Sequence, residues 1–258
     1  MKRKKILILG GMGEVGRILS NGLCDTYDVI VSDIASTGAD DHGRYIQIDI
    51  TDFSQLIEKV TPDIDVIINL AGLPEKDSII SETEVKEMSD LYVVGSYNVF
   101  LCAKMLGIPK VVFASTNHVS GYYENNGDSS LGRLITSSDS PAPDSAYGAM
   151  KSCAEQFGFV FANECNISII SLRIGTVRSN ELELLKDNGR AHKTILSAVD
   201  TVNLFISAME TKTKYGVYYG VSDNPGKPWD IENAILELSY KPTQNSKSIV
   251  KQKTLQGK

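Results

Sequence analysis

Two short segments carry side chains that could together move a proton and support a hydride transfer. Thr116-Asn117-His118 follows an apolar run, and Tyr147 precedes Lys151 by four residues at the start of a helical stretch. A hydroxyl, a phenol and an ammonium that converge can take the proton of a substrate alcohol while a cofactor accepts the hydride. The Tyr-x-x-x-Lys spacing alone would equally fit two solvated residues on one helix face, so the elements around it decide.

Short apolar runs alternate with helical stretches along most of the chain. The runs are rich in Ile and Val, as in parallel strands buried on both faces, and span residues 5–9, 29–32, 45–48, 66–69, 111–114 and 167–172. The helical stretches span residues 15–23, 53–60, 89–105 and 147–164, with Asp52 placed to cap the second. This alternation predicts an α/β fold of the Rossmann type, a doubly wound parallel sheet with helices on both faces.

A glycine-rich turn between the first strand and the first helix predicts a phosphate-binding site. The segment Gly10-Gly11-Met12-Gly13-Glu14-Val15-Gly16 places glycines three residues apart. Such a turn needs unusual backbone angles, and the helix that follows offers free N–H groups and its positive dipole end to a pyrophosphate. Its place directly after a strand supports a dinucleotide site.

The end of the second strand favours NAD over NADP. Asp33 stands about 20 residues after the turn, where a carboxylate binds the adenosine ribose hydroxyls and repels a 2′-phosphate. Residues 34–41 contain no Arg or Lys that would bind that phosphate. The predicted NAD contacts are Gly10, Met12, Gly13, Val15, Asp33, Ile34, Asp49, Ile50, Leu70, Ala71 and Gly72, together with Tyr147 and Lys151.

The alternation loosens after Arg173. A polar stretch covers residues 179–193, and a helix at 199–209, a strand at 217–221 and a short helix at 231–238 are expected. The tail from Gln244 onward is polar and is predicted to be mobile. We predict a single NAD-binding Rossmann domain over residues 1–258, in which 175–196 and 222–243 form a small C-terminal substrate cap.

Composition excludes several other classes of protein. The 258 residues are 42% hydrophobic and 22% charged, which indicates an ordinary globular protein. A net charge of −6 argues against nucleic-acid binding, and no apolar run approaches the roughly 20 residues that cross a bilayer. The four cysteines form no Cys-x-x-Cys pair and the three histidines lack metal-ligand spacing, so we expect a reducing cytoplasm and no metal.

Together these segments resemble the extended short-chain dehydrogenase/reductase superfamily, also called the NAD-dependent epimerase/dehydratase family, over about residues 5–240. The narrower resemblance is to the uronate dehydrogenases. It is carried by residues 112–123, 143–148, 171–176, 217–224 and 229–230. The Asn-His pair and the late Tyr-Gly-Val-Ser stretch are its most discriminating parts.

The resemblance implies a catalytic set. Tyr147 would be the general acid/base, and Lys151 would lower the pKa of its phenol and hold the nicotinamide ribose. Thr116 stands where the family usually has a serine, and its hydroxyl would bind the reacting oxygen. A free phenol has a pKa of about 10, so a tyrosine base near neutral pH needs a positive charge beside it.

The resemblance also implies substrate contacts, namely Asn117, His118, Thr176 and Arg190. Arg190 matches the arginine that clamps a uronate carboxylate, which a guanidinium can bind through two parallel hydrogen bonds. His118 would also fit a loop histidine without a ligand role, and Arg190 an exposed charge. For Arg173, directly after a buried strand, we favour a structural role.

Three departures from the family put the substrate in doubt. Pro74 stands where a substrate-binding serine is expected, and Tyr92 where an asparagine commonly supports an active-site water. An insertion at residues 179–186 lengthens the segment that leads to Arg190.

We therefore expect an NAD-dependent oxidoreductase that converts a uronic acid to its aldarolactone by oxidising the anomeric hydroxyl. The alternatives are a dehydrogenase of another sugar or sugar phosphate, a nucleotide-sugar epimerase or dehydratase, and a non-catalytic NAD-binding protein. By analogy with relatives, residues 89–105 and 147–164 would pair two copies into a homodimer or a higher homo-oligomer.

Overall fold

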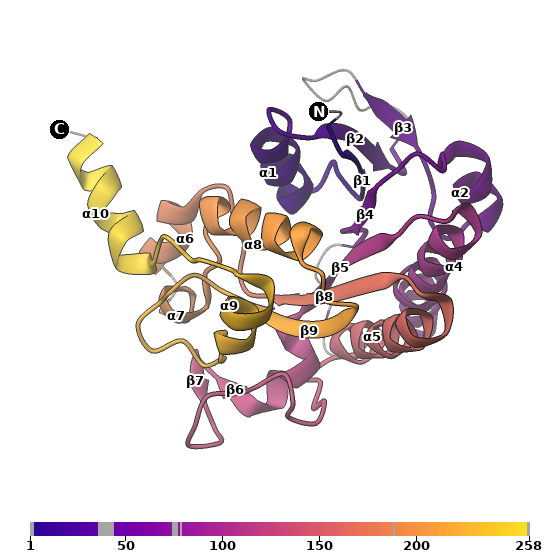
Figure 1. Cartoon of the computed structure of the whole chain (residues 1–258). Coiled ribbons are helices and arrows are strands. Elements are labelled where there is room, and N and C mark those ends of the chain that lie inside the picture. The colour runs from indigo at the N-terminus through magenta and orange to yellow at the C-terminus, as the bar shows by residue number, and fades with distance from the viewer. Residues whose placement is uncertain (1–2, 36–43, 74–76, 78, 188, 257–258) are drawn as a thin grey trace.

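The computed structural model describes residues 3–35, 44–73, 77, 79–187 and 189–256, and it has a seven-stranded parallel sheet at its centre (Figure 1). The strand order is β3-β2-β1-β4-β5-β8-β9, and every neighbouring pair runs parallel. The predicted doubly wound sheet is thus confirmed. The strands are β1 (Lys5–Leu9), β2 (Asp28–Asp33), β3 (Tyr45–Gln47), β4 (Val66–Asn69), β5 (Lys110–Thr116), β8 (Ser168–Ile174) and β9 (Tyr215–Gly220).

Helices cover both faces of the sheet, as Figure 1 shows. One face packs against α1 (Glu14–Leu23), α8 (Ala198–Glu210) and α9 (Glu232–Leu238). The other packs against α2 (Phe53–Lys59), α4 (Ser96–Leu106) and α5 (Ala146–Cys165). Side chains of a strand point alternately to the two faces, so in β1 Ile6 and Ile8 enter one core, and Leu7 and Leu9 the other.

The strand order reverses between β1 and β4. The chain leaves β1 toward β3 and returns on the other side of β1 to begin β4. In an open α/β sheet the carboxyl ends of the strands at such a point border the ligand crevice. The glycine turn, Asp33 and Asn69-Leu70-Ala71 all follow strand ends at this edge.

Local signals account for several boundaries. The Asp52 side chain accepts hydrogen bonds from Ser54 and Gln55 N–H groups at the start of α2, as predicted. Ser145 caps α5 in the same way, through the Gly148 N–H, and so fixes where the helix that carries Tyr147 begins.

The single helix predicted at residues 89–105 was wrong. Instead α3 (Glu82–Ser89), begun by a Ser81–Glu84 capping box, passes into a π-helical turn at Asp90–Gly95 and then into α4. The apolar periodicity does not distinguish a continuous α-helix from one with an extra residue in a turn. The π-helical turn contains Tyr92, which faces the active site described below.

The C-terminal part is more ordered than predicted. The polar stretch after Arg173 contains α6 (Glu181–Asp187) and α7 (Ala191–Thr194). The tail predicted to be mobile forms α10 (Ser246–Gln256), which contacts both of these helices and buries Ile249 between them. Hydrogen bonds from Thr243 and Gln244 to Asp200 and from the Ser246 N–H to Asn224 also hold this segment, and periodicity does not reveal them.

The remaining elements are a 3-10 helix at Asn117–Tyr123 and a two-stranded antiparallel hairpin, β6 (Glu124–Asn125) and β7 (Asp128–Ser129). In the described part of the chain, no helix is long and apolar enough to cross a membrane.

Candidate active site

The glycine turn brings the ends of β1 and β4 into close contact. Gly10 has a φ of +75°, and a Cβ there would lie 2.7 Å from the Cα of Ala71. Only glycine satisfies both the positive φ and this approach. The turn therefore leaves the backbone bare at the N-terminus of α1, where a pyrophosphate would find free N–H groups.

A cavity of about 350 Å³ opens beside this turn. It is lined by every residue predicted to bind NAD except Met12 and the Tyr147–Lys151 pair, namely Gly10, Gly13, Val15, Asp33, Ile34, Asp49, Ile50, Leu70, Ala71 and Gly72. The lining combines the Asp33 and Asp49 carboxylates with apolar side chains and glycine backbone, which suits the ribose, adenine and pyrophosphate of a dinucleotide.

Asp33 connects the second strand to the glycine turn. Its Oδ2 accepts the Met12 N–H at 3.0 Å, and its Oδ1 accepts the Ile34 N–H at 2.8 Å. These bonds hold the carboxylate at the cavity wall, in the position predicted for binding ribose hydroxyls. They also give Met12 a supporting role, which explains its place outside the lining. The sequence after Asp33 lacks Arg and Lys up to residue 41. Residues 36–43 lie outside the described residues, so the structure describes only Ile34 and Ala35 of this stretch.

The cavity has one charged wall that the sequence did not indicate. Arg178 and Glu14 both line it, and the Arg178 Nη1 lies 3.6 Å from a Glu14 carboxylate oxygen. Glu14 also accepts a hydrogen bond from the Ser179 hydroxyl at 2.8 Å, which joins the glycine turn to the segment after β8. Two positions 164 residues apart carry no joint signal in one sequence, so only the fold identifies the pair.

Thr116 ends β5, next to the switch point. Its side chain is 5% exposed and its Oγ1 accepts the His118 N–H at 3.2 Å. The hydroxyl acts as acceptor in this bond, so its own proton remains free to be donated to a substrate oxygen. Asn117 is equally buried beside it, at the start of the 3-10 helix.

A close backbone approach places His118 beside the catalytic helix. A Cβ at Gly148 would lie 2.3 Å from the His118 carbonyl oxygen, so only glycine lets α5 pack here. The His118 and Tyr147 ring centroids are 6.1 Å apart. The His118 Nδ1 lies 2.9 Å from an Asp144 carboxylate oxygen, which holds the ring and leaves Nε2 as its second polar atom. Sequence reasoning had not identified Asp144.

Lys151 is buried in an aromatic cage. Its Nζ donates to the Ala114 carbonyl at 2.8 Å and lies 4.7 Å from the Phe113 ring centroid, 4.9 Å from that of Tyr92 and 5.9 Å from that of Tyr147. Burial lowers the pKa of Lys151 to about 7, and the negative charge of Glu155 opposes this shift. The amine is thus easier to deprotonate than an exposed lysine, and it stands beside the predicted base.

Tyr92 links this cage to the cofactor cavity. Its hydroxyl accepts the Leu73 N–H at 2.8 Å, and its ring packs edge-on against Tyr147 with centroids 5.1 Å apart. Leu73 itself lines the cavity. The Tyr92 ring therefore contacts both predicted catalytic side chains, Tyr147 and Lys151. Pro74, the other departure in this segment, lies outside the described residues.

A buried ion pair holds the helix that carries Tyr147 and Lys151. Arg173 and Glu155 are 3% and 1% exposed, and two guanidinium nitrogens bond the two carboxylate oxygens at 2.9 and 2.8 Å. Tyr219 accepts a third bond from Arg173 at 3.2 Å. The structural role favoured for Arg173 fits this network, which fixes Glu155 one helical turn from Lys151.

The predicted carboxylate clamp has a partner within the chain. The Arg190 Nε bonds the two Glu124 oxygens at 3.1 and 3.0 Å, and its Nη2 bonds one of them at 2.6 Å. Thr176, the other predicted substrate residue at this end, shares a 3.2 Å contact between its hydroxyl and that of Thr194. Neither lies in the cavity beside the glycine turn, and no feature of the sequence indicated Glu124.

The model of the NAD dependent epimerase/dehydratase family matches residues 6–204. The chain belongs to this family. The predicted fold, cofactor and enzyme class, an NAD-dependent oxidoreductase family with a Rossmann-like sheet, are thereby confirmed. The cavity residues fit that cofactor on their own geometry.

Three similar proteins span nearly the whole chain. YtbQ of Bacillus subtilis (strain 168), an uncharacterized protein, is 42% identical over 96% of this chain and 97% of its own. A uronate dehydrogenase of Pseudomonas syringae pv. tomato is 28% identical over 94% of this chain and 82% of its own. The crystal structure of a glucuronic acid dehydrogenase from Chromohalobacter salexigens has a TM-score of 0.82 at 26% identity and covers 97% of this chain and 88% of its own.

Proposed function

We propose that this chain is an NAD-dependent sugar dehydrogenase that oxidises the anomeric hydroxyl of a pyranose to the lactone. The observation that carries the proposal is the placement of Lys151. Its ammonium lies within 6 Å of the Tyr147 ring centroid and bonds the strand that ends in Thr116. A protein that only bound NAD would need the cavity but not this cage.

In the proposed reaction Tyr147 accepts the proton of the anomeric hydroxyl as the C1–O bond becomes a carbonyl. NAD, when bound, takes the hydrogen and electron pair of the C1–H bond as hydride. Thr116 donates its hydroxyl proton to the reacting oxygen and so holds it toward Tyr147. Asn117 and His118 bind neighbouring sugar hydroxyls, with Asp144 orienting the imidazole. The charge of Lys151 favours the tyrosinate that forms on proton loss.

We propose that the residues predicted to contact NAD bind the parts of the cofactor predicted from the sequence. Asp33 would bind the adenosine ribose, and the turn from Gly10 to Val15 the pyrophosphate, with Arg178 as an additional cation near it. The residues 175–196 and 222–243 would form the substrate cap. A cytoplasmic location and assembly into a homodimer or a higher homo-oligomer remain parts of the proposal.

Two substrate classes have specific support. The uronic acid predicted from the sequence is supported by the similarity to a uronate dehydrogenase and a glucuronic acid dehydrogenase. A sugar without a carboxylate is supported by the Glu124 side chain, which already binds the Arg190 guanidinium.

The reaction type is tested by incubating the purified chain with NAD and single sugars, and following the absorbance of NADH. The panel holds neutral aldoses, the matching uronates, aldose phosphates and nucleotide sugars. We expect turnover with a free sugar and a lactone as the product. Conversion of a nucleotide sugar to its epimer without NADH formation would replace this proposal by an epimerase, and NAD binding without any turnover would leave a pure binding protein.

A further inference from the structure

We infer that Glu124 is a specificity-determining residue that takes the place of a substrate carboxylate on Arg190, so that the preferred sugar is uncharged at that end. The inference rests on the proposed sugar dehydrogenase function and narrows its substrate class. It follows from the contacts of one side chain and from the elements that hold it.

The Glu124 carboxylate occupies one of the two edges through which the Arg190 guanidinium can bind an acid bidentately. It bonds Nε and Nη2, the two nitrogens that form one edge of the guanidinium fork, with the shortest distance at 2.6 Å. A carboxylate that binds arginine bidentately uses such an edge. Within this pair the guanidinium charge is therefore already balanced by an internal carboxylate.

The pair is built into the fold rather than formed by two free side chains. Glu124 is 8% exposed and also accepts the Gly127 N–H at the turn of the β6–β7 hairpin. A second ion pair, between Lys193 of α7 and Asp128 of β7, fastens the same hairpin to the same helix. A Cβ at Gly127 would lie 3.0 Å from the Lys193 side chain, so hairpin and helix are in direct contact.

This contact connects the segment that carries Asn117 and His118 with the predicted substrate cap at residues 175–196. Glu124 directly follows the 3-10 helix that begins with Asn117 and His118. On the other side, the Arg190 carbonyl accepts the Thr194 hydroxyl at 3.2 Å, and that hydroxyl contacts Thr176 at the same distance. Two short connections thus join the pair to residues predicted to touch the sugar.

A uronate carboxylate meets two obstacles at this place. It has to share one guanidinium with Glu124, so two like charges stand close together and repel each other beside a cation whose side chain is 29% exposed. The alternative is to displace Glu124, which leaves a buried carboxylate without its cation and is strongly unfavourable. A hydroxymethyl group or a hydrogen at the same sugar carbon meets neither obstacle, and a phosphate meets both.

The test measures binding to the enzyme saturated with NADH, so that it does not depend on turnover. Isothermal titration calorimetry gives the affinities for D-galactose and D-galacturonate of the wild type and of the variants Glu124→Gln, Glu124→Ala and Arg190→Ala. We expect the wild type to bind the neutral sugar at least tenfold more tightly. Glu124→Gln keeps an acceptor for the Gly127 N–H and should gain at least tenfold in galacturonate affinity, with galactose changed less than threefold. Adding Arg190→Ala should abolish that gain.

Asp128→Asn is the matched control, since it breaks the neighbouring ion pair of the same hairpin without touching Arg190. It should leave the preference between the two sugars unchanged. A wild type that prefers galacturonate, or a folded Glu124→Gln that gains no affinity for it, would overturn the inference. Absence of turnover with every sugar would reject the dehydrogenase function instead, and the two failures are therefore distinguishable.

Discussion

The predicted cofactor-binding and substrate-binding regions differ in how far backbone geometry determines the positions of their residues. We call the residues that line the cavity the cofactor edge, and Thr176 and Arg190 the substrate edge. At the cofactor edge, backbone turns after β1, β2 and β4 shape one cavity, and nearly all predicted residues line it. At the substrate edge, Thr176 and Arg190 lie on separate segments, and their partners Thr194 and Glu124 come from elsewhere in the chain. Similarity to relatives therefore supports the predicted cofactor-binding residues more strongly than the predicted substrate-binding residues.

Tyr147 stands where the two edges meet, and its phenol has the largest expected effect. Tyr147→Phe should lower kcat by about three orders of magnitude, because general acid–base catalysis by one side chain contributes roughly 10²–10⁴-fold. NADH affinity, measured by fluorescence titration, should change little, since the ring and its packing on Tyr92 remain.

Tyr122→Phe is the control for that change, because Tyr122 is 74% exposed and lies on the neighbouring 3-10 helix. It should keep full turnover. If Tyr147→Phe retained wild-type kcat, proton transfer would have to be assigned to another group and the two edges would no longer meet at this residue.

Lys151 offers a test by stability. A lysine whose pKa falls from 10.5 to about 7 on folding binds fewer protons in the native state between these values. The free energy of unfolding should therefore rise with pH through this window. Lys151→Met removes this dependence. The stability of the wild type relative to the variant should therefore rise by roughly 2 to 3 kcal/mol over two pH units, measured by urea unfolding at about pH 7.5 and 9.5.

The matched control is a replacement of Lys104, an exposed lysine on α4. Lys104→Met should keep the pH dependence of the wild type, because an exposed ammonium pays no desolvation on folding. A parallel shift of wild type and Lys151→Met with pH would mean that folding does not lower the pKa of this ammonium, and that its charge is fully present at neutral pH.

The same contrast explains what the sequence could predict. The glycine turn, Asp33 and the buried strands leave local signals, since backbone angles, burial and strand ends restrict residue types over short spans. Glu124 and Asp144 leave none, because each acts on a partner 66 or 26 residues away and would be an ordinary acid if that partner were elsewhere. The π-helical turn at Tyr92 and the α10 helix were missed for a related reason: packing decided them, not periodicity.

Arg178 would sharpen the cofactor edge, where it is the charged wall that the sequence did not indicate. Arg178→Ala should weaken NAD binding about fivefold, close to 1 kcal/mol, because its side chain is 55% exposed and solvent screens its attraction to a pyrophosphate. The loss should shrink at high salt. Arg133→Ala removes an equally exposed guanidinium remote from the cavity and should leave the affinity unchanged. Equal losses in both variants would reduce the effect of Arg178 to net charge.

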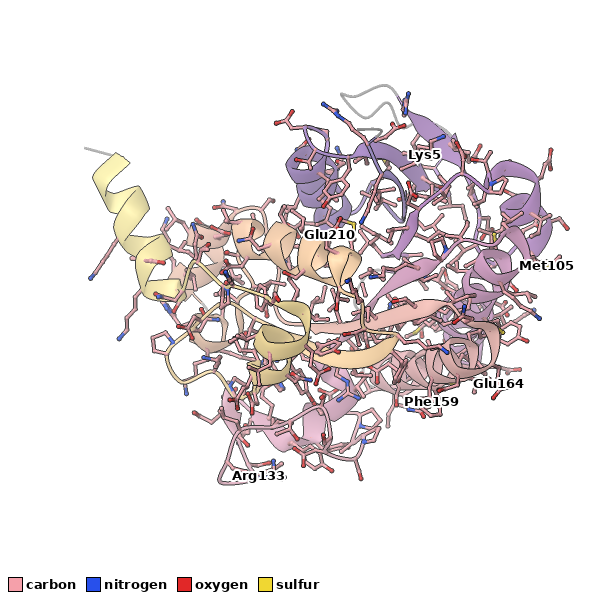
Figure 2. All side chains as sticks on the ribbon, viewed as in Figure 1. Lys5, Met105, Arg133, Phe159, Glu164 and Glu210 are labelled. Carbon is pink, nitrogen blue, oxygen red and sulfur yellow. The ribbon has the colours of Figure 1, made fainter. Side chains whose placement is uncertain are left out.

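The smallest effect on catalysis is expected at the outer surface of α4 and α5, behind the cofactor edge. Figure 2 shows Met105 and Phe159 at the periphery of these helices, and they are 59% and 51% exposed, with Val160 beside them at 52%. We expect these exposed apolar side chains on two helices to belong to an association surface. We expect a dimer by light scattering, and Phe159→Lys should convert it to a monomer at micromolar concentration. Glu164→Gln, which changes the charge by the same +1 at the end of α5, should leave the dimer intact. Turnover per chain should stay within twofold, because Phe159 does not line the cavity beside the glycine turn; a large loss would mean that the partner completes the site.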